Sequence, residues 1–356
     1  MTGRSATVKK KMKWRKWVAL LTGFCLLLSL CSCNGIHGND MESRIRQTAK
    51  AMQKQSETKY LLEDEERFPG GDSSGDWTAL VLKLSGRKDA YEAYLNRLTE
   101  YVGRAYQEKG YLHQIKATEY HRIALTMCAL GGDPTQIEYG GMDIDLVADG
   151  SYRFPGGSPG LQGANGIIYA LLTLDAVGYE IPDGEPITRE ELVKELLSFQ
   201  KPDGGFCLDN GLESDVDITA MALQALAPYR EEPEAEYAVE TALIWLKTQM
   251  TENGAFVSYG MENTESCAQV ILALCALKTD PAESSLVTKG GKTVLDGMEF
   301  FRLDSGLYSH VKGEEADWMA TYQALLALEA VEKLRGEQRW ILDFTGTVSM
   351  GTGKEG

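Results

Sequence analysis

The stretch that decides the fold is ESDVDITAMALQALAPY, residues 213–229, in which Asp215 and Asp217 precede a run of Ala, Leu and Met. A run of this kind is apolar on nearly every side, which indicates a helix that is buried all round. Similar segments begin at residues 76, 119, 165, 265 and 317. Such near-regular spacing indicates one supersecondary unit that is used six times.

A second kind of helix is predicted between these segments. Residues 91–107, 189–199 and 235–250 carry an apolar stripe at helical spacing, and residues 41–54 supply a first helix of this kind. Turns with Gly just before an aromatic residue, as in QKPDGGF (200–206), join the two kinds.

The predicted fold class is therefore all-α, an α6/α6 toroid of six helix-pair repeats over residues 41–342. The inner helices are expected to run parallel, with their N-termini gathered around a central cavity. An open superhelical solenoid is the alternative, but six units without a polar capping repeat favour closure.

The N-terminus reads as a targeting segment. Six basic residues between Lys9 and Lys16 precede the apolar run of residues 17–30, which is shorter than a spanning helix, and the chain continues Cys31-Ser32-Cys33. This pattern resembles a bacterial lipobox and predicts a lipoprotein signal peptide over residues 1–33. Cys33 is expected to be lipidated, with Cys31 as the other candidate. An ordinary secretory signal or an uncleaved anchor is the alternative.

The leader predicts an extracytoplasmic location, with the protein anchored in the lipid bilayer of the cell membrane through Cys33. A short tether over residues 34–40 and a flexible Gly-rich tail over residues 343–356 flank the toroid. Without the leader, 29 basic and 52 acidic side chains remain, a net charge of −23. This charge excludes nucleic acid as a partner and favours cationic or neutral ligands.

The repeats resemble a known family. QKPDGGFCL, DVDITAMALQALAPY and ENTESCAQVILALCALKTDP are similar to repeats of the terpenoid cyclase and protein prenyltransferase α/α toroid. GDWTAL and MATYQALLALEA are similar to repeats of exported toroid proteins of Gram-positive bacteria, often lipoproteins. The resemblance covers about residues 40–342 and implies the toroid fold.

The resemblance to squalene–hopene-type cyclases implies a proton donor at Asp217. Their D-x-D-D-T-A motif is matched by D-V-D-I-T-A, in which Ile218 replaces the last acid. The residues by themselves support a simpler interpretation, because an acid at the start of a buried helix caps its free N–H groups. Comparable positions in the other repeats hold Asp76, Glu119, Asn165, Glu265 and Asp317.

The resemblance to protein prenyltransferases implies a zinc site, for which Glu265 and Cys267 are the candidate ligands. The family's His falls on Ala320, although His310 on a nearby turn could reach the site. No cofactor is predicted, and zinc remains an alternative. A complement-type thioester is rejected because residues 335–338 read Arg-Gly-Glu-Gln, without the Cys.

The predicted function is that of an exported, membrane-anchored lipoprotein that binds a small molecule or peptide in the mouth of the toroid. The alternative is an isoprenoid cyclase or prenyltransferase-type enzyme, with Asp217 as acid or a metal at Glu265 and Cys267. Corrinoid binding is a further alternative. The predicted ligand-binding residues are Trp77, Glu119, His121, Asn165, Asp217, Glu265 and Trp318.

Overall fold

The computed structural model describes residues 38–284 and 290–346. The predicted signal peptide, the lipidation site Cys33 and the last ten residues of the predicted tail lie outside the described residues. Within the described part, every helix is too short or too polar to span a bilayer. Helix α2 begins at Gly38, three residues before the predicted start of the toroid.

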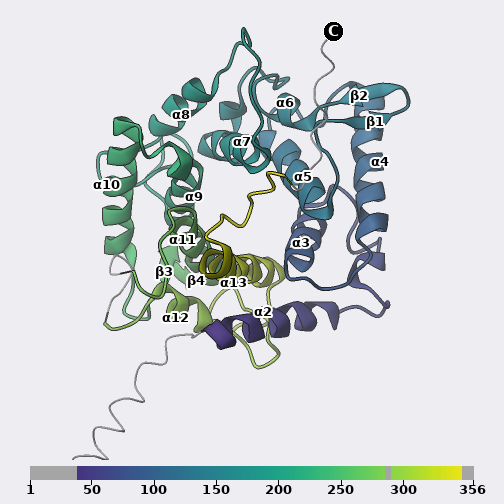
Figure 1. The fold of residues 1–356 in the computed structure, drawn as a ribbon. Helices are drawn as coiled ribbons and strands as arrows, with labels where there is room; N and C mark the ends of the chain where they lie inside the picture. The colour runs from purple at the N-terminus through teal and green to yellow at the C-terminus, as the bar shows by residue number, and fades with distance from the viewer. Residues whose placement is uncertain (1–37, 285–289, 347–356) are drawn as a thin grey trace, which may run out of the picture. The chain divides into compact units, whose positions relative to one another are not determined.

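Six inner helices form a closed ring (Figure 1). Each packs on the next along the chain, and the last packs on the first. The ring is closed, so the structure confirms the toroid over the solenoid. The inner helices are α3 (Ser73–Leu84), α5 (Ala117–Leu130), α7 (Ala164–Val177), α9 (Val216–Leu226), α11 (Thr264–Ala276) and α13 (Trp318–Glu337).

An outer layer covers the ring. Helix α4 packs on α5, α8 on α7, α10 on α9, α12 on α11 and α2 on α13, while the short α6 lies against α5 and α7. The outer helices are α2 (Gly38–Gln53), α4 (Tyr91–Lys109), α6 (Leu146–Gly150), α8 (Arg189–Leu197), α10 (Pro233–Gln249) and α12 (Val294–Glu299).

Short elements occupy the connections. Single 3-10 turns, η1 (Leu61–Glu63), η2 (Pro159–Gln162) and η3 (Ala227–Tyr229), interrupt the loops. Two antiparallel hairpins make up the β-structure of the described residues. One pairs β1 (Ile137–Tyr139) with β2 (Met142–Ile144), and the other pairs β3 (Phe256–Ser258) with β4 (Met261–Asn263).

The Gly-aromatic turns form as predicted. Gly204, Gly254 and Gly306 have φ angles of 96°, 80° and 91°, a left-handed region that glycine adopts without strain. Two residues after each glycine an aromatic ring is fully buried: Phe206, Phe256 and Tyr308. The turn therefore reverses the chain and anchors the start of the next inner helix to the core.

The inner helices run parallel, because neighbouring helices meet at like ends. At the N-terminal end, Ser258 Oγ in β3 donates to Asp215 Oδ2 at 2.9 Å, and Trp318 Nε1 donates to Thr78 Oγ1 at 2.8 Å. At the C-terminal end, Arg230 Nη1 after α9 donates to the carbonyl of Leu277 after α11. We call the N-terminal end of the ring its mouth.

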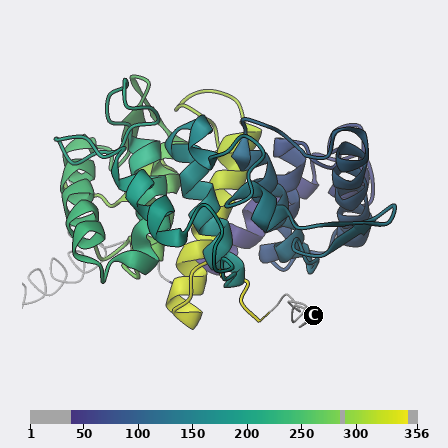
Figure 2. The same ribbon diagram turned by 90° about the horizontal axis from the view of Figure 1, so that it is seen from above.

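Residues 338–346, here called the C-terminal strap, cross the other end of the ring (Figure 1). The strap starts at α13 and reaches α7 on the opposite side, where the Phe344 N–H donates to the Ala176 carbonyl at 2.7 Å. Ile341, Leu342 and Phe344 are buried. The predicted domain end at residue 342 and free tail from residue 343 are therefore wrong at this point, because Phe344 packs on the ring. Figure 2 shows the strap at the C-terminal end of α13.

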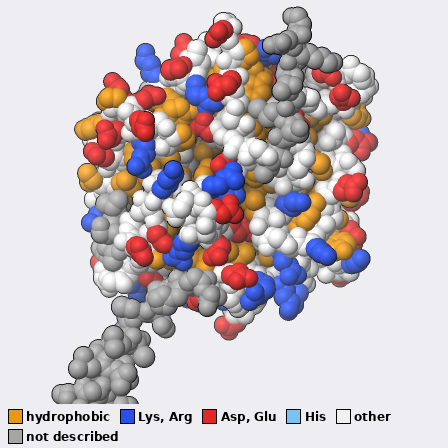
Figure 3. Space-filling model, in the orientation of Figure 1, with side chains coloured by type: hydrophobic (Ala, Val, Ile, Leu, Met, Phe, Trp, Pro, Cys, Tyr) orange, Lys and Arg blue, Asp and Glu red, His pale blue; other side chains and the backbone are white. Residues whose placement is uncertain are grey.

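The acidic excess is visible on the face drawn in Figure 3. Acidic side chains are spread over this face among basic and hydrophobic ones. The whole chain carries 52 acidic against 36 basic residues. A surface of this kind repels polyanions and suits an aqueous environment.

Candidate functional site

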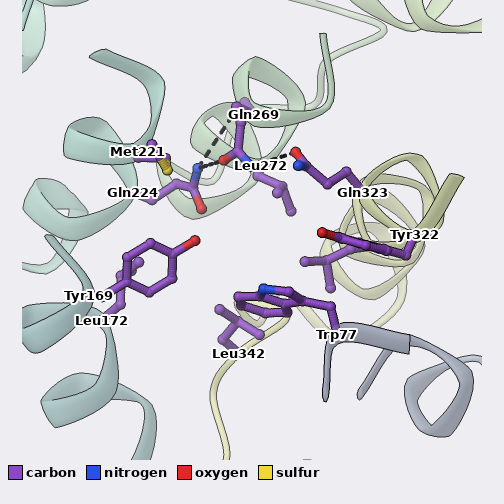
Figure 4. Close-up of a pocket in the computed structure, with 11 residues that line it drawn as sticks. Trp77, Tyr169, Leu172, Met221, Gln224, Gln269, Leu272, Tyr322, Gln323 and Leu342 are labelled. Atoms are coloured by element: carbon purple, nitrogen blue, oxygen red, sulfur yellow. Dashed lines mark hydrogen bonds between the residues drawn. The ribbon is translucent and has the colours of Figure 1, made fainter. Parts of the chain in front are cut away.

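A cavity of about 60 Å³ lies inside the ring (Figure 4). Five of the six inner helices and the strap contribute to its wall, which is apolar with a few polar groups. Such a composition is typical of small-molecule sites. The lining residues are Trp77, Tyr169, Leu172, Met221, Gln224, Gln269, Leu272, Tyr322, Gln323, Leu326 and Leu342.

Three aromatic side chains from three helices face this cavity: Trp77, Tyr169 and Tyr322 (Figure 4). The ring centroids of Trp77 and Tyr169 are 6.2 Å apart with their planes at 53°. Burial raises the pKa of Tyr169 to about 12, so its hydroxyl stays protonated at neutral pH. The structure thus places the predicted Trp77 at the cavity and adds two tyrosines.

A chain of three glutamines crosses the cavity wall. Gln224 Nε2 donates to Gln269 Oε1, and Gln269 Nε2 donates to Gln323 Oε1, both at 2.9 Å (Figure 4). The glutamines come from α9, α11 and α13. The sequence prediction missed this row. Its signal was a single Gln within the apolar stretch of each of three inner helices, since a buried amide needs a partner.

On the α3/α5 side of the mouth, the charges are paired. Arg122 Nε lies 2.8 Å from Asp76 Oδ2, and its Nη2 lies 2.8 Å from Glu119 Oε2. Tyr94 Oη donates to Asp76 Oδ1 at 2.7 Å. Burial raises the pKa of Asp76 while Arg122 opposes the shift. The predicted ligand-binding residue Glu119 is thus held by an arginine.

On the α9 side, the mouth holds two aspartates with different surroundings. Asp215 is the N-cap, because its Oδ1 accepts from the N–H groups of Asp217 and Ile218. Asp217 lies in the first turn, as an acid that offsets the charge of the helix N-terminus would, but it is not the N-cap. Its Oδ1 is buried without a hydrogen-bond partner.

Asp217 lies on the cavity side of α9. It precedes the cavity residues Met221 and Gln224 by four and seven positions, which places all three on one helix face. The pKa of Asp217 is raised to about 6, chiefly by burial; Asp215 and Glu265 also favour the protonated form, while Ser266 and His310 oppose it. The carboxyl is thus an unpaired acid above the cavity.

The other predicted caps are also corrected in part. Asp72 caps α3 in place of Asp76, and Asn263 caps α11 in place of Glu265. Asp317 caps α13 as predicted, by accepting from the Ala320 N–H at 2.8 Å. Helices α5 and α7 have no side-chain cap. The acids were misread because an N-cap and a first-turn acid lie only two to four residues apart.

Glu265 does meet His310, as the sequence allowed. Glu265 Oε2 lies 2.9 Å from His310 Nδ1. Burial opposes protonation of His310, but Glu265 outweighs it and raises the pKa of the imidazole. Burial also raises the pKa of Glu265 itself. This pair stands next to Asp217 at the mouth.

The zinc set that the resemblance implies does not fit these residues. Cys267 is fully buried, and burial raises the pKa of its thiol to about 12. Ala320 supplies no ligand where the family has His. Among residues 38–284 and 290–346, no three His, Cys, Asp or Glu side chains gather in a group that could hold a metal ion.

The remaining predicted residues divide between mouth and core. His121 is fully buried against Gly150 of α6, and burial lowers its pKa to about 3. It is a structural residue and does not contact the cavity as a ligand-binding residue would. Asn165 lies one helical turn before Tyr169 on α7, and its Oδ1 is buried without a partner. Trp318 donates to Thr78 and stacks under Arg67, at 4.5 Å from the guanidinium carbon to the ring centroid.

Large apolar side chains surround the mouth, a feature that the sequence prediction missed. Each lies within four residues of an inner-helix N-terminus and is about half exposed. Four of them could have been noticed as apolar residues in the polar turns before the buried helices, whereas Met319 lies in the first turn of α13. They are Ile115, Leu161, Leu212, Met261 and Met319.

Comparisons with known proteins agree with this architecture. Protein geranylgeranyltransferase-I of Candida albicans, solved in complex with GGPP, has a similar fold, with a TM-score of 0.56 and 11% sequence identity. The match covers 85% of this chain and 96% of that one. A search of curated protein sequences finds no match. Residues 162–347 match the prenyltransferase alpha-alpha toroid domain. The chain therefore belongs to the prenyltransferase alpha-alpha toroid family.

Proposed function

We propose that this protein is an exported lipoprotein, anchored through Cys33, whose toroid binds a small molecule. The ligand enters at the mouth and occupies the cavity between Trp77, Tyr169 and Tyr322. One observation carries the proposal: the strap crosses one end of the ring, and its Leu342 forms part of the cavity wall. We place the entrance at the mouth because the strap packs across part of the other end.

The surroundings of the cavity suit a binding site. Parallel inner helices bring their free N–H groups to the mouth, which provides directed polar contacts above an apolar wall. The five half-exposed apolar residues around the mouth, here called the rim, offer further contacts to the ligand. The cavity is far too small to enclose a corrinoid, so that alternative loses support.

The enzyme alternatives receive less support. Protonation of an alkene needs a strong acid, whereas burial shifts the pKa of Asp217 upward to about 6 and makes it a weaker one. A prenyl diphosphate such as the GGPP bound by the Candida albicans protein needs cationic partners. The α9/α11 side of the mouth offers Asp217 and Glu265 instead.

The maturation part of the proposal rests on the basic start, the apolar run and Cys33. Mass spectrometry of the protein extracted from its own membranes tests it. We expect an N-terminal diacylglyceryl-modified Cys33. An unmodified N-terminus beyond residue 33 would contradict it.

Native mass spectrometry of the same detergent-extracted protein tests ligand binding. We expect a mass excess that corresponds to one organic molecule and disappears on denaturation. Leu342→Trp should abolish it by filling the cavity, whereas Leu212→Trp, on the exposed rim, should retain it. Absence of any excess, or an excess unchanged by Leu342→Trp, would overturn binding in the cavity. Stoichiometric zinc that is lost in Cys267→Ser would instead favour the metal-dependent alternative.

A further inference from the structure

We infer that the ligand is an organic cation of trimethylammonium size, held between the three aromatic rings with its charge toward Asp217. This inference rests on the proposed function, because it names the ligand class of the same cavity. Three observations carry it: the aromatic walls, a carboxylate without an ion-pair partner, and buried polar groups on the helices that line the cavity.

The aromatic walls come first. An ammonium group within about 6 Å of an aromatic face is attracted by the ring quadrupole, and several rings around one space form a cage for methylated ammonium groups. The ring centroids of Trp77 and Tyr169 are 6.2 Å apart with tilted planes, and Tyr322 lies beside Trp77 with its hydroxyl toward the cavity (Figure 4). None of these three rings has a protein cation stacked on it within the described part of the chain.

The second observation is the charge balance around the cavity. Arg122 is engaged by Asp76 and Glu119, and His310 by Glu265. Asp217 forms no ion pair with any described residue. A buried charge is costly unless it is paired, so an unpaired carboxylate above an aromatic cavity is complementary to a cation.

The third observation concerns polar groups next to Asp217 and on α7. Ser266 on α11 is fully buried, and its side chain lowers the pKa of the Asp217 carboxyl, which favours the ionised form that attracts a cation. Asn165, one helical turn before the cavity residue Tyr169, has its Oδ1 buried without a partner. Buried polar groups are normally satisfied, and an unsatisfied one requires an explanation, which a ligand in the cavity would supply.

Isothermal titration of the full-length protein in detergent at pH 7.5 tests the inference with choline and its uncharged isostere 3,3-dimethyl-1-butanol. The Asp217 carboxyl, with a pKa of about 6, is ionised at this pH. We expect choline to bind at least about tenfold more tightly than the isostere, because only choline gains the charge interaction. Equal affinity, or no binding of choline, overturns the inference.

Single variants measure how much Asp217 and Trp77 each contribute to choline binding. Asp217→Asn should weaken choline binding about tenfold and leave binding of the isostere unchanged, and Trp77→Leu should weaken choline by a similar factor. Glu190→Gln, an exposed acid in the first turn of α8, is the matched control and should bind choline as the wild type does. If Asp217→Asn and Glu190→Gln behave alike, the carboxylate has no role and the inference fails.

The two proposals can fail separately. A neutral or anionic molecule retained in native mass spectrometry and expelled by Leu342→Trp would support the binding function and overturn the cation. No mass excess in native mass spectrometry, together with no choline binding in the titration, would overturn both.

Discussion

On two sides of the mouth an aspartate lies in the first turn of an inner helix. One carboxylate is paired with an arginine and the other is not. On the α3 side, Asp76 is fully buried and receives Arg122, Tyr94 and the Gly71 N–H. On the α9 side, Asp217 is half-buried, its Oδ1 lacks a hydrogen-bond partner, and it forms no ion pair with a described residue, because the nearby His310 pairs with Glu265. An aspartate at a comparable place in the repeat therefore stabilises the ring on one side, and on the other side it remains without an ion-pair partner.

The difference shows how a repeat protein separates structure from function. A buried charged residue that stabilises the fold has its ion-pair and hydrogen-bond partners within the protein, since a buried charge without them costs several kcal/mol. A residue that awaits a ligand lacks those partners in the protein alone. The contrast makes opposite predictions for the removal of each acid.

The largest expected effect is the loss of Asp76. Asp76→Ala leaves Arg122 buried with Glu119 as its one remaining carboxylate, and should lower the free energy of unfolding by about 3–5 kcal/mol. Urea denaturation followed by circular dichroism measures the change. The double variant Asp76→Ala/Arg122→Met should recover part of the loss, because the uncompensated charge is then removed. A loss under about 1 kcal/mol in Asp76→Ala would remove the contrast between the two sides.

Much of the fold is visible in the sequence because it depends on local pattern. Six all-apolar segments and Gly-aromatic turns define the inner helices, and their period predicts the ring. Partners far apart along the chain are not visible: Arg122 reaches Asp76 across 46 residues, and Phe344 reaches Ala176 across the ring. Sequence therefore located the mouth correctly but not the paired or unpaired state of its acids.

The orientation of side chains set a second limit. His121 and Glu119 are two residues apart at the start of α5, yet Glu119 is partly exposed at the mouth and His121 is sealed against α6. Helical spacing predicts that such neighbours point in different directions, but it does not tell which one faces the axis. The glutamine row was missed for a similar reason: Gln269 and Gln323 lie six residues after the N-caps of their helices, but Gln224 lies nine residues after its own.

The next largest effect has the opposite sign. Asp217→Asn should raise the free energy of unfolding at pH 7.5 by about 1–3 kcal/mol, because the wild type must hold an ionised carboxyl in a buried place. The pKa of about 6 in the folded protein lies above the usual aspartate value of 3.8. The folded state therefore binds the proton more tightly, and the stability contributed by this group is present below pH 3.8 and lost as the pH rises through 6.

Urea unfolding of both proteins at pH 4.5, 6.0 and 7.5 checks this prediction. The advantage of Asp217→Asn should grow with pH, whereas other titrating groups are shared and cancel in the difference. A variant that is less stable than the wild type by the same amount at every pH would show that Asp217 supports the fold.

The smallest expected effect concerns the neighbouring Asp215. Its variants test whether an acid here stabilises the protein as an N-cap or destabilises it through its charge. Its Oδ1 accepts from two N–H groups at the start of α9, and its Oδ2 accepts from Ser258 Oγ in β3. Asp215→Ala should therefore lower the free energy of unfolding by about 1 kcal/mol, as loss of an N-cap does. Asp215→Asn retains an acceptor and should lose less. Thermal unfolding of the two variants beside Asp217→Asn makes the comparison within one helix turn. If Asp215→Ala stabilised the protein as Asp217→Asn is expected to, general relief of acidic repulsion would explain both, and the distinction between a capping acid and an unpaired one would fall.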